Sequence, residues 1–207
     1  LANNAVHDII ENSGFLWIAT ANGLSRFDFQ TKTFKNFGVS NGLPINEFSA
    51  GIRSESGEMI FGGINGFVIF HPNQLTDNTY IPPVVLTSLQ QNGKDMNTGQ
   101  APENLSRFTI RWPDNSLEFG FTTLSYTQPE KNQHAYLLEG FDKEWNYLGS
   151  RRFGRYTNLP GGTYTLRLKG SNSDGVWNEA GLSIQVTVVP PFLDTWWFRG
   201  MVALVPP

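Results

Sequence analysis

Apolar and polar residues alternate one by one along three segments in the second half of the chain. The segments are residues 117–122, 164–169 and 182–188. Their apolar members are Leu117, Phe119, Phe121, Tyr164, Leu166, Leu168, Leu182, Ile184, Val186 and Val188. A period of two places alternate side chains on one face of an extended strand, so each segment predicts a β-strand with one buried face. Short strands separated by turn-forming residues over positions 84–190 favour a β-sandwich of the immunoglobulin or fibronectin-III type.

The first part of the chain carries one pattern twice, at residues 13–28 and 56–71, with a constant offset of 43 residues. Each copy has Ser-Gly, a short apolar segment, Asn-Gly and a second apolar segment. The repeat-signature residues are Gly14, Asn22, Gly23, Gly57, Asn65 and Gly66. Because Asn-Gly tolerates positive φ at both central positions of a tight hairpin, each copy predicts an antiparallel meander. The alternative is two unrelated hairpins that share Asn-Gly by chance.

The repeat period lies in the range of β-propeller blades, which are about 40–50 residues long. Two blades cannot close a ring of about 4–8 blades. We therefore expect residues 1–78 to form the last two four-stranded blades of an incomplete propeller, with an unpaired flank that favours self-association or partial disorder. The fold class predicted for the whole chain is all-β.

Prolines mark the ends of the predicted sandwich. Residues 72–83 are polar and include three prolines, and we assign residues 79–83 as a linker. Pro190-Pro191 closes the last strand, and Trp196-Trp197 precede an apolar run. Tryptophan is enriched at membrane interfaces, so residues 191–207 are expected to be a juxtamembrane segment and the start of a truncated transmembrane helix. The alternative is an amphipathic tail that packs on the sandwich. The chain starts at Leu1 and is interpreted as a fragment of a longer protein.

Composition narrows the function classes. Hydrophobic residues make up 39% and charged residues 16% of the chain, which suits a packed core and not a disordered segment. The net charge of −3, with no basic block, gives no electrostatic footprint for nucleic acid. The absence of cysteine excludes disulfides, thiol catalysis and cysteine-ligated metals.

No catalytic or cofactor-binding motif in the sequence is flanked by the elements that such a motif needs. Residues 38–42 fit G-x-S-x-G, but Leu43-Pro44 and hairpin patterning follow in place of the helix that a nucleophile elbow needs. His7, His71 and His134 lack the spacing of a zinc site. The fragment is therefore expected to be no enzyme, with no catalytic residue, metal or cofactor. The aromatic residues could stack on sugars, but alternating strand positions favour core packing.

Residues 5–78 resemble the repeat of two-component regulator propellers. The residues that match are Gly42, Leu43, Asn46, Gly57, Gly63, Asn65, Gly66 and Phe70, with residues 14–34 as the preceding repeat. Residues 84–198 resemble the three-tyrosine (Y_Y_Y) domain. Its signature falls on Tyr136, Tyr156, Tyr164, Trp145, Gly161 and Trp177. Tyr164 is also placed as a tyrosine corner, whose hydroxyl bonds backbone near residues 158–160.

These resemblances imply the periplasmic sensor region of a hybrid two-component histidine kinase. They imply an oligosaccharide ligand bound by the complete propeller, homodimerisation through the sandwich, attachment at the periplasmic face of the inner membrane, and control of transcription by a receiver and DNA-binding output. The ligand-binding residues are not specified by the sequence. The competing interpretation is a non-signalling carbohydrate-binding or interaction module attached to a polysaccharide-degrading enzyme.

Overall fold

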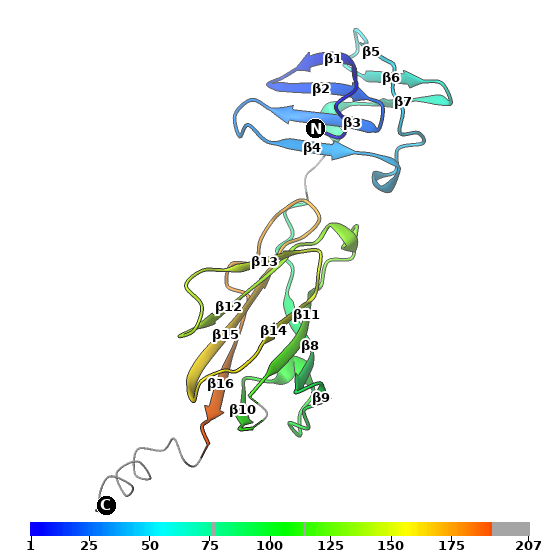
Figure 1. The fold of residues 1–207 in the computed structure, drawn as a ribbon. Helices are drawn as coiled ribbons and strands as arrows, with labels where there is room; N and C mark the ends of the chain where they lie inside the picture. Colours follow the sequence, from blue (N-terminus) through cyan, green and yellow to red (C-terminus); the bar gives the residue numbers. More distant parts are fainter. Residues whose placement is uncertain (76–77, 114, 192–207) are drawn as a thin grey trace, which may run out of the picture. The chain divides into compact units, whose positions relative to one another are not determined.

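The computed structural model describes residues 1–75, 78–113 and 115–191 (Figure 1). The chain forms two compact units, residues 1–77 and 78–207. The described residues form β-strands and short 3-10 turns and contain no α-helix, which confirms the all-β class.

The first unit has seven strands: β1 (Val6–Asn12), β2 (Phe15–Thr20), β3 (Gly23–Asp28), β4 (Phe34–Phe37), β5 (Ala50–Arg53), β6 (Met59–Gly63) and β7 (Gly66–Phe70). Its 3-10 turns are η1 (Val39–Asn41) and η2 (Pro72–Gln74). The second unit has nine strands: β8 (Val84–Gln91), β9 (Lys94–Asp95), β10 (Arg107–Arg111), β11 (Leu117–Thr123), β12 (His134–Glu139), β13 (Asn146–Gly149), β14 (Phe153–Tyr156), β15 (Gly162–Gly170) and β16 (Leu182–Val189). Its 3-10 turns are η3 (Pro102–Asn104) and η4 (Pro129–Lys131).

The first unit contains two antiparallel meanders, as the repeat predicts. The first sheet has the order β1-β2-β3-β4 and the second the order β5-β6-β7. The expectation of two four-stranded blades was therefore wrong for the second copy, which has three strands among the described residues. By the 43-residue offset, β4 corresponds to residues 77–80, and the described part of that segment belongs to the second unit. The described residues do not form a closed ring.

The Asn-Gly hairpins differ from the prediction by one position. Strand β2 ends at Thr20 and β3 begins at Gly23, so Ala21 and Asn22 are the central turn residues. Gly23 follows the turn with φ of 109°, and a Cβ there would lie 2.4 Å from the Phe37 carbonyl oxygen. The close approach of β4 therefore requires glycine at this position.

Aromatic rings fill the core of the first unit. Trp17 is 1% exposed and stacks on Phe37 at 5.6 Å between ring centroids. Phe48 and Phe61 are fully buried in the same cluster. Adjacent meanders are also tied by a hydrogen bond from the Gly51 amide to Asp8 Oδ2 (2.7 Å).

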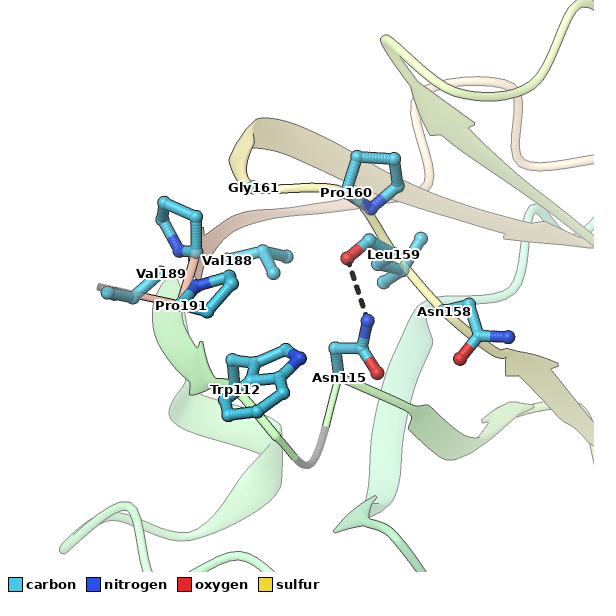
Figure 2. Close-up of a pocket in the computed structure, with 10 residues that line it drawn as sticks. Trp112, Asn115, Asn158, Leu159, Pro160, Gly161, Val188, Val189 and Pro191 are labelled. Atoms are coloured by element: carbon cyan, nitrogen blue, oxygen red, sulfur yellow. Dashed lines mark hydrogen bonds between the residues drawn. The ribbon is translucent and has the colours of Figure 1, made fainter. Parts of the chain in front are cut away.

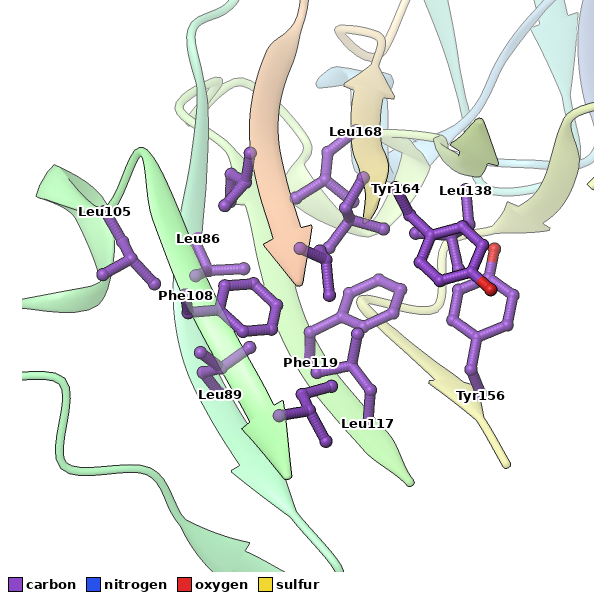
Figure 3. Packing of buried hydrophobic residues seen from close by; sticks show 14 of the residues in the cluster. Leu86, Leu89, Leu105, Phe108, Leu117, Phe119, Leu138, Tyr156, Tyr164 and Leu168 are labelled. Atoms are coloured by element: carbon purple, nitrogen blue, oxygen red, sulfur yellow. The ribbon is translucent and has the colours of Figure 1, made fainter. Parts of the chain in front are cut away.

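The second unit has two sheets around one core (Figure 3). The five-stranded sheet has the order β10-β16-β15-β12-β13 and the four-stranded sheet the order β14-β11-β8-β9. Strand β10 pairs parallel with β16, while the other pairs are antiparallel.

The alternation in the sequence correctly identifies the inward positions of β11, β15 and β16. Phe119, Leu166 and Ile184 are 2%, 0% and 0% exposed and belong to the same cluster. Side chains from both sheets therefore pack face to face, as in a β-sandwich.

Candidate functional site

A pocket in the first unit lies at two turns related by the repeat. It has a volume of about 450 Å³ and is lined by Ala21, residues 44–47, Ile64 and Asn65. Ala21 and Ile64 occupy equivalent positions in the two copies, and residues 44–47 connect the first meander to the second. Asn46 is held in place because its Oδ1 accepts from the Val39 amide at 2.9 Å. The pocket therefore offers amide, carboxylate and aliphatic groups to a small polar molecule.

A second pocket, of about 380 Å³, lies at the end of the sandwich where β16 stops (Figure 2). Trp112, a residue that is 55% exposed, lies with its ring beside Pro191 and Val189. The opposite wall is the run from Asn158 to Gly161. Asn115 fixes that wall through a hydrogen bond from its Nδ2 to the Leu159 carbonyl (3.3 Å).

Gly161 stands at this second pocket for a steric reason. A Cβ on Gly161 would lie 2.6 Å from the Cβ of Pro190, which is shorter than real contacts allow. The signature glycine therefore permits the close passage of the chain that leaves β16.

The three signature tyrosines come from different strands and meet through their rings. Tyr136 packs edge-on against Tyr156 (5.6 Å), and Phe141 contacts both Tyr156 and Tyr164. Tyr164 Oη donates to the Pro160 carbonyl at 3.0 Å, the hydrogen bond expected of a tyrosine corner. Tyr156 and Tyr164 lie in the core cluster (Figure 3), and Tyr136 packs against it partly buried. The three tyrosines are therefore not arranged as an exposed platform.

Tyr156 is the most strongly perturbed of these tyrosines. Burial, followed by the hydrogen bond to Asp142, raises the pKa of Tyr156 far above its ordinary value. Its hydroxyl therefore stays protonated and donates to Asp142 Oδ2. The same carboxylate oxygen accepts from the Leu138 amide at 2.8 Å, which fixes the turn after β12.

Lys169 lies among three aromatic rings on the outer face of the five-stranded sheet. Its Nζ is 4.5 Å from the Trp145 centroid, 5.2 Å from Trp177 and 5.5 Å from Tyr147. It also donates to Glu179 Oε2 at 2.9 Å. Burial alone would lower the pKa of Lys169, but its interactions with Glu179 and then Tyr147 together outweigh burial and raise the pKa. We call these residues the lysine cage; the sequence placed Trp145 and Trp177 in the signature but gave no sign of their common partner.

The repeat-signature residues lie at the turns of the meanders. Gly14 and Gly57 lie between paired strands, and Asn22 and Asn65 lie in the turns that precede Gly23 and Gly66. Trp196 and Trp197 lie outside the described residues. Among the described residues, no group of three or more His, Cys, Asp or Glu is placed to hold a metal ion. No helix in the described ranges is long and apolar enough to cross a membrane.

Comparison with known proteins finds a family match within the second unit. Residues 125–189 match the family described as the Y_Y_Y domain, and the match includes the three signature tyrosines and strands β12, β13, β15 and β16.

The chain as a whole is similar to two-component sensor proteins. It is 28% identical to histidine kinase P4 of Formosa agariphila over 97% of its own length and 15% of that protein. It superimposes on the extracellular domain of a B. thetaiotaomicron protein described as the hybrid two component system BT3049, with a TM-score of 0.75 and 25% identity over 92% of this chain and 27% of that one. A second extracellular domain from B. thetaiotaomicron, BT4673, described as a one component system, gives a TM-score of 0.51 and 26% identity over 92% of this chain and 26% of that one.

These similarities confirm the resemblance drawn from the sequence. The chain is homologous to a histidine kinase and to extracellular domains of two-component sensors, and it spans about a quarter or less of the relatives that it matches.

Proposed function

We propose that this chain is the extracytoplasmic sensing and relay portion of a membrane-bound hybrid two-component histidine kinase. The observation that carries the proposal is that the similarity runs through both units, since it covers 92% of the chain in the extracellular domain of BT3049 and 97% in histidine kinase P4. An isolated sandwich shared with unrelated proteins would match the second unit alone.

The ligand proposed is an oligosaccharide bound by the complete propeller. The pocket at residues 44–47 supports this class of ligand, because Asn46, Glu47 and Asn65 can hydrogen-bond hydroxyl groups while Ile45 and Ile64 contact the apolar face of a sugar ring. The sandwich is proposed to relay the binding event, as a homodimer at the periplasmic face of the inner membrane, to a kinase that controls transcription.

The test uses the full-length protein in its own host. Cells with and without the gene are transferred to a partial hydrolysate of mixed plant and algal polysaccharides, and transcripts are counted. We expect a set of transcripts that is induced in the wild type, lost in the deletion and restored by complementation. No difference between the strains would refute the sensor, and hydrolysis of the polysaccharides by the purified protein would favour an enzyme-attached module.

The location is tested separately by fusing a reporter after Pro191 of the full-length protein. We expect alkaline phosphatase to be active and β-galactosidase inactive at this position. The reverse result would place the sandwich in the cytoplasm and overturn the proposal.

A further inference from the structure

Asn172 makes an unusually complete set of hydrogen bonds. It is 0% exposed. Its Nδ2 donates to the carbonyls of Asn78 (2.7 Å) and Tyr80 (2.8 Å). Its Oδ1 accepts from the amides of Asp174 and Val176, both at 2.9 Å. Both amide hydrogens and both lone-pair directions of the Asn172 side chain thus have partners. Its two amide hydrogens both bind carbonyls at the start of the second unit.

Two neighbours of Asn172 bind the same segment. Asp174 Oδ2 accepts from the Asn78 amide at 2.7 Å. Asn178 Nδ2 donates to the Pro82 carbonyl at 2.9 Å. We call residues 78–82 the junction segment and residues 171–181 the clamp loop. Side chains of the clamp loop therefore hold the backbone of Tyr80 and Pro82, within the residues expected to be a linker, and of Asn78 just before them.

The clamp loop is itself fixed to the five-stranded sheet. The Ser171 amide donates to the Gln133 carbonyl (2.8 Å) and the Asn178 amide to the Gly170 carbonyl (2.9 Å). Trp177 and Glu179 hold Lys169 of β15 in the lysine cage. The loop joins β15 to β16, whose end leads out of the sandwich at Pro190 and Pro191. A displacement at Asn78 thus has a hydrogen-bonded route to β16.

We propose that Asn172 is a positioning residue for signal relay: it couples movement of the chain at Asn78 to the sandwich, and it is needed for signalling and not for ligand binding. This rests on the proposed sensor function. A ligand can shift an equilibrium only by favouring one arrangement over another. In a junction segment without these bonds, backbone rotations would take up a displacement of the chain at Asn78. In the clamped segment the same displacement is transmitted to the five-stranded sheet.

The clamp is tested first without any ligand, by amide exchange on the 207-residue chain. Asn172→Ala removes the bonds to Asn78 and Tyr80 and the acceptor that positions Asp174. We expect the Asn78 amide to exchange roughly tenfold faster or more, since the two lost bonds each carry about 1 kcal/mol. Asn132→Ala is the matched control, because Asn132 is 1% exposed and donates from Nδ2 to the Ser125 carbonyl (2.8 Å) within the sandwich. Unchanged exchange at Asn78 in Asn172→Ala would overturn the proposal.

Relay is tested in the full-length protein with the polysaccharide hydrolysate as probe. We expect Asn172→Ala to lose most of the induction while the purified extracellular region binds the hydrolysate as the wild type does, and Asn132→Ala to keep its induction. Asn178→Ala, which removes one bond to Pro82 and lies nearer the surface, should show a smaller loss if Asn172→Ala fails to fold.

The outcomes separate the relay from the sensor function. Full induction in both Asn172→Ala and Asn178→Ala refutes the relay and leaves the sensor standing. Absence of any response in the wild type refutes the sensor, while the exchange result still decides whether Asn172 holds the junction segment.

Discussion

Lys169→Met removes the positive charge from the lysine cage and keeps an unbranched apolar stem. The ammonium lies within 6 Å of three ring centroids, and the Lys169 side chain is only 7% exposed. A cation over an aromatic face is worth about 0.5–1 kcal/mol at the surface and about 2 kcal/mol when desolvated. The ion pair with Glu179, which is 69% exposed, adds less than about 1 kcal/mol.

Methionine also avoids the cost of burying an ammonium group, which offsets part of these gains. We therefore expect Lys169→Met to lower the free energy of unfolding of the second unit by about 1–2 kcal/mol. For a unit of this size the corresponding fall in Tm is about 3–8 °C.

Differential scanning calorimetry of the chain measures this change. Arg167→Met is the matched control on the same sheet face, because Arg167 lies 5.7 Å from the Trp145 ring and pairs with Glu139 at 3.0 Å. Both members of that pair are at least 35% exposed, so the loss should stay below about 0.5 kcal/mol. A Lys169→Met protein as stable as the wild type, or no less stable than Arg167→Met, would refute the reasoning.

The pH dependence gives a second check on Lys169. The folded-state pKa lies above the ordinary value of 10.5, so the stabilisation is fully present below that value and is lost only as the pH rises through the folded-state pKa. The difference between wild type and Lys169→Met should therefore be constant from neutral to mildly alkaline pH.

Three further changes test other parts of the molecule. Tyr164→Phe removes the hydrogen bond to Pro160 and should cost about 1 kcal/mol in urea unfolding; an unchanged midpoint would count against the tyrosine corner. Burial holds the pKa of His134 below its ordinary value of 6.5. The stability that neutral His134 contributes is therefore fully present above pH 6.5 and is lost as the pH falls from there through the folded-state pKa. His134→Leu should flatten this acid-side decline in Tm, and an equally steep decline in the variant would exclude His134 as its source. Ile69→Lys places a charge on β7, an edge strand of the second sheet. If unpaired β7 is the edge through which the chain self-associates, this charge should reduce the self-association measured by light scattering.

The sequence predicted the all-β fold and the inward faces of the sandwich strands because burial imposes a strict period of two. Phe119, Leu166 and Ile184 occupy the positions that this period requires. The repeat correctly located the hairpins, but the position of Gly23 just after its turn depends on the approach of Phe37. That approach is a tertiary contact, and the residues around Gly23 in the sequence do not predict it.

That the second meander has three strands among the described residues could not be predicted for a related reason. Residues 77–80 have the spacing of a blade strand, but Asn172 and Asp174, more than 90 residues away in the sequence, bind Asn78. The lysine cage escaped prediction in the same way, since Trp145, Lys169 and Trp177 meet only when β12 pairs with β13 on one side and with β15 on the other. Long-range side-chain partners leave no periodic trace in one sequence.

The clamp on Asn78 also bears on where this chain could be joined to the first unit of a related protein. A chimera that joins a foreign first unit within residues 78–82 would separate the junction carbonyls from the Asn172 and Asn178 side chains that donate to them. A crossover between Phe70 and Leu75 transfers the whole junction segment with its own sandwich. We therefore expect the smallest part that can be transferred with its contacts intact to begin at Asn78, several residues before strand β8.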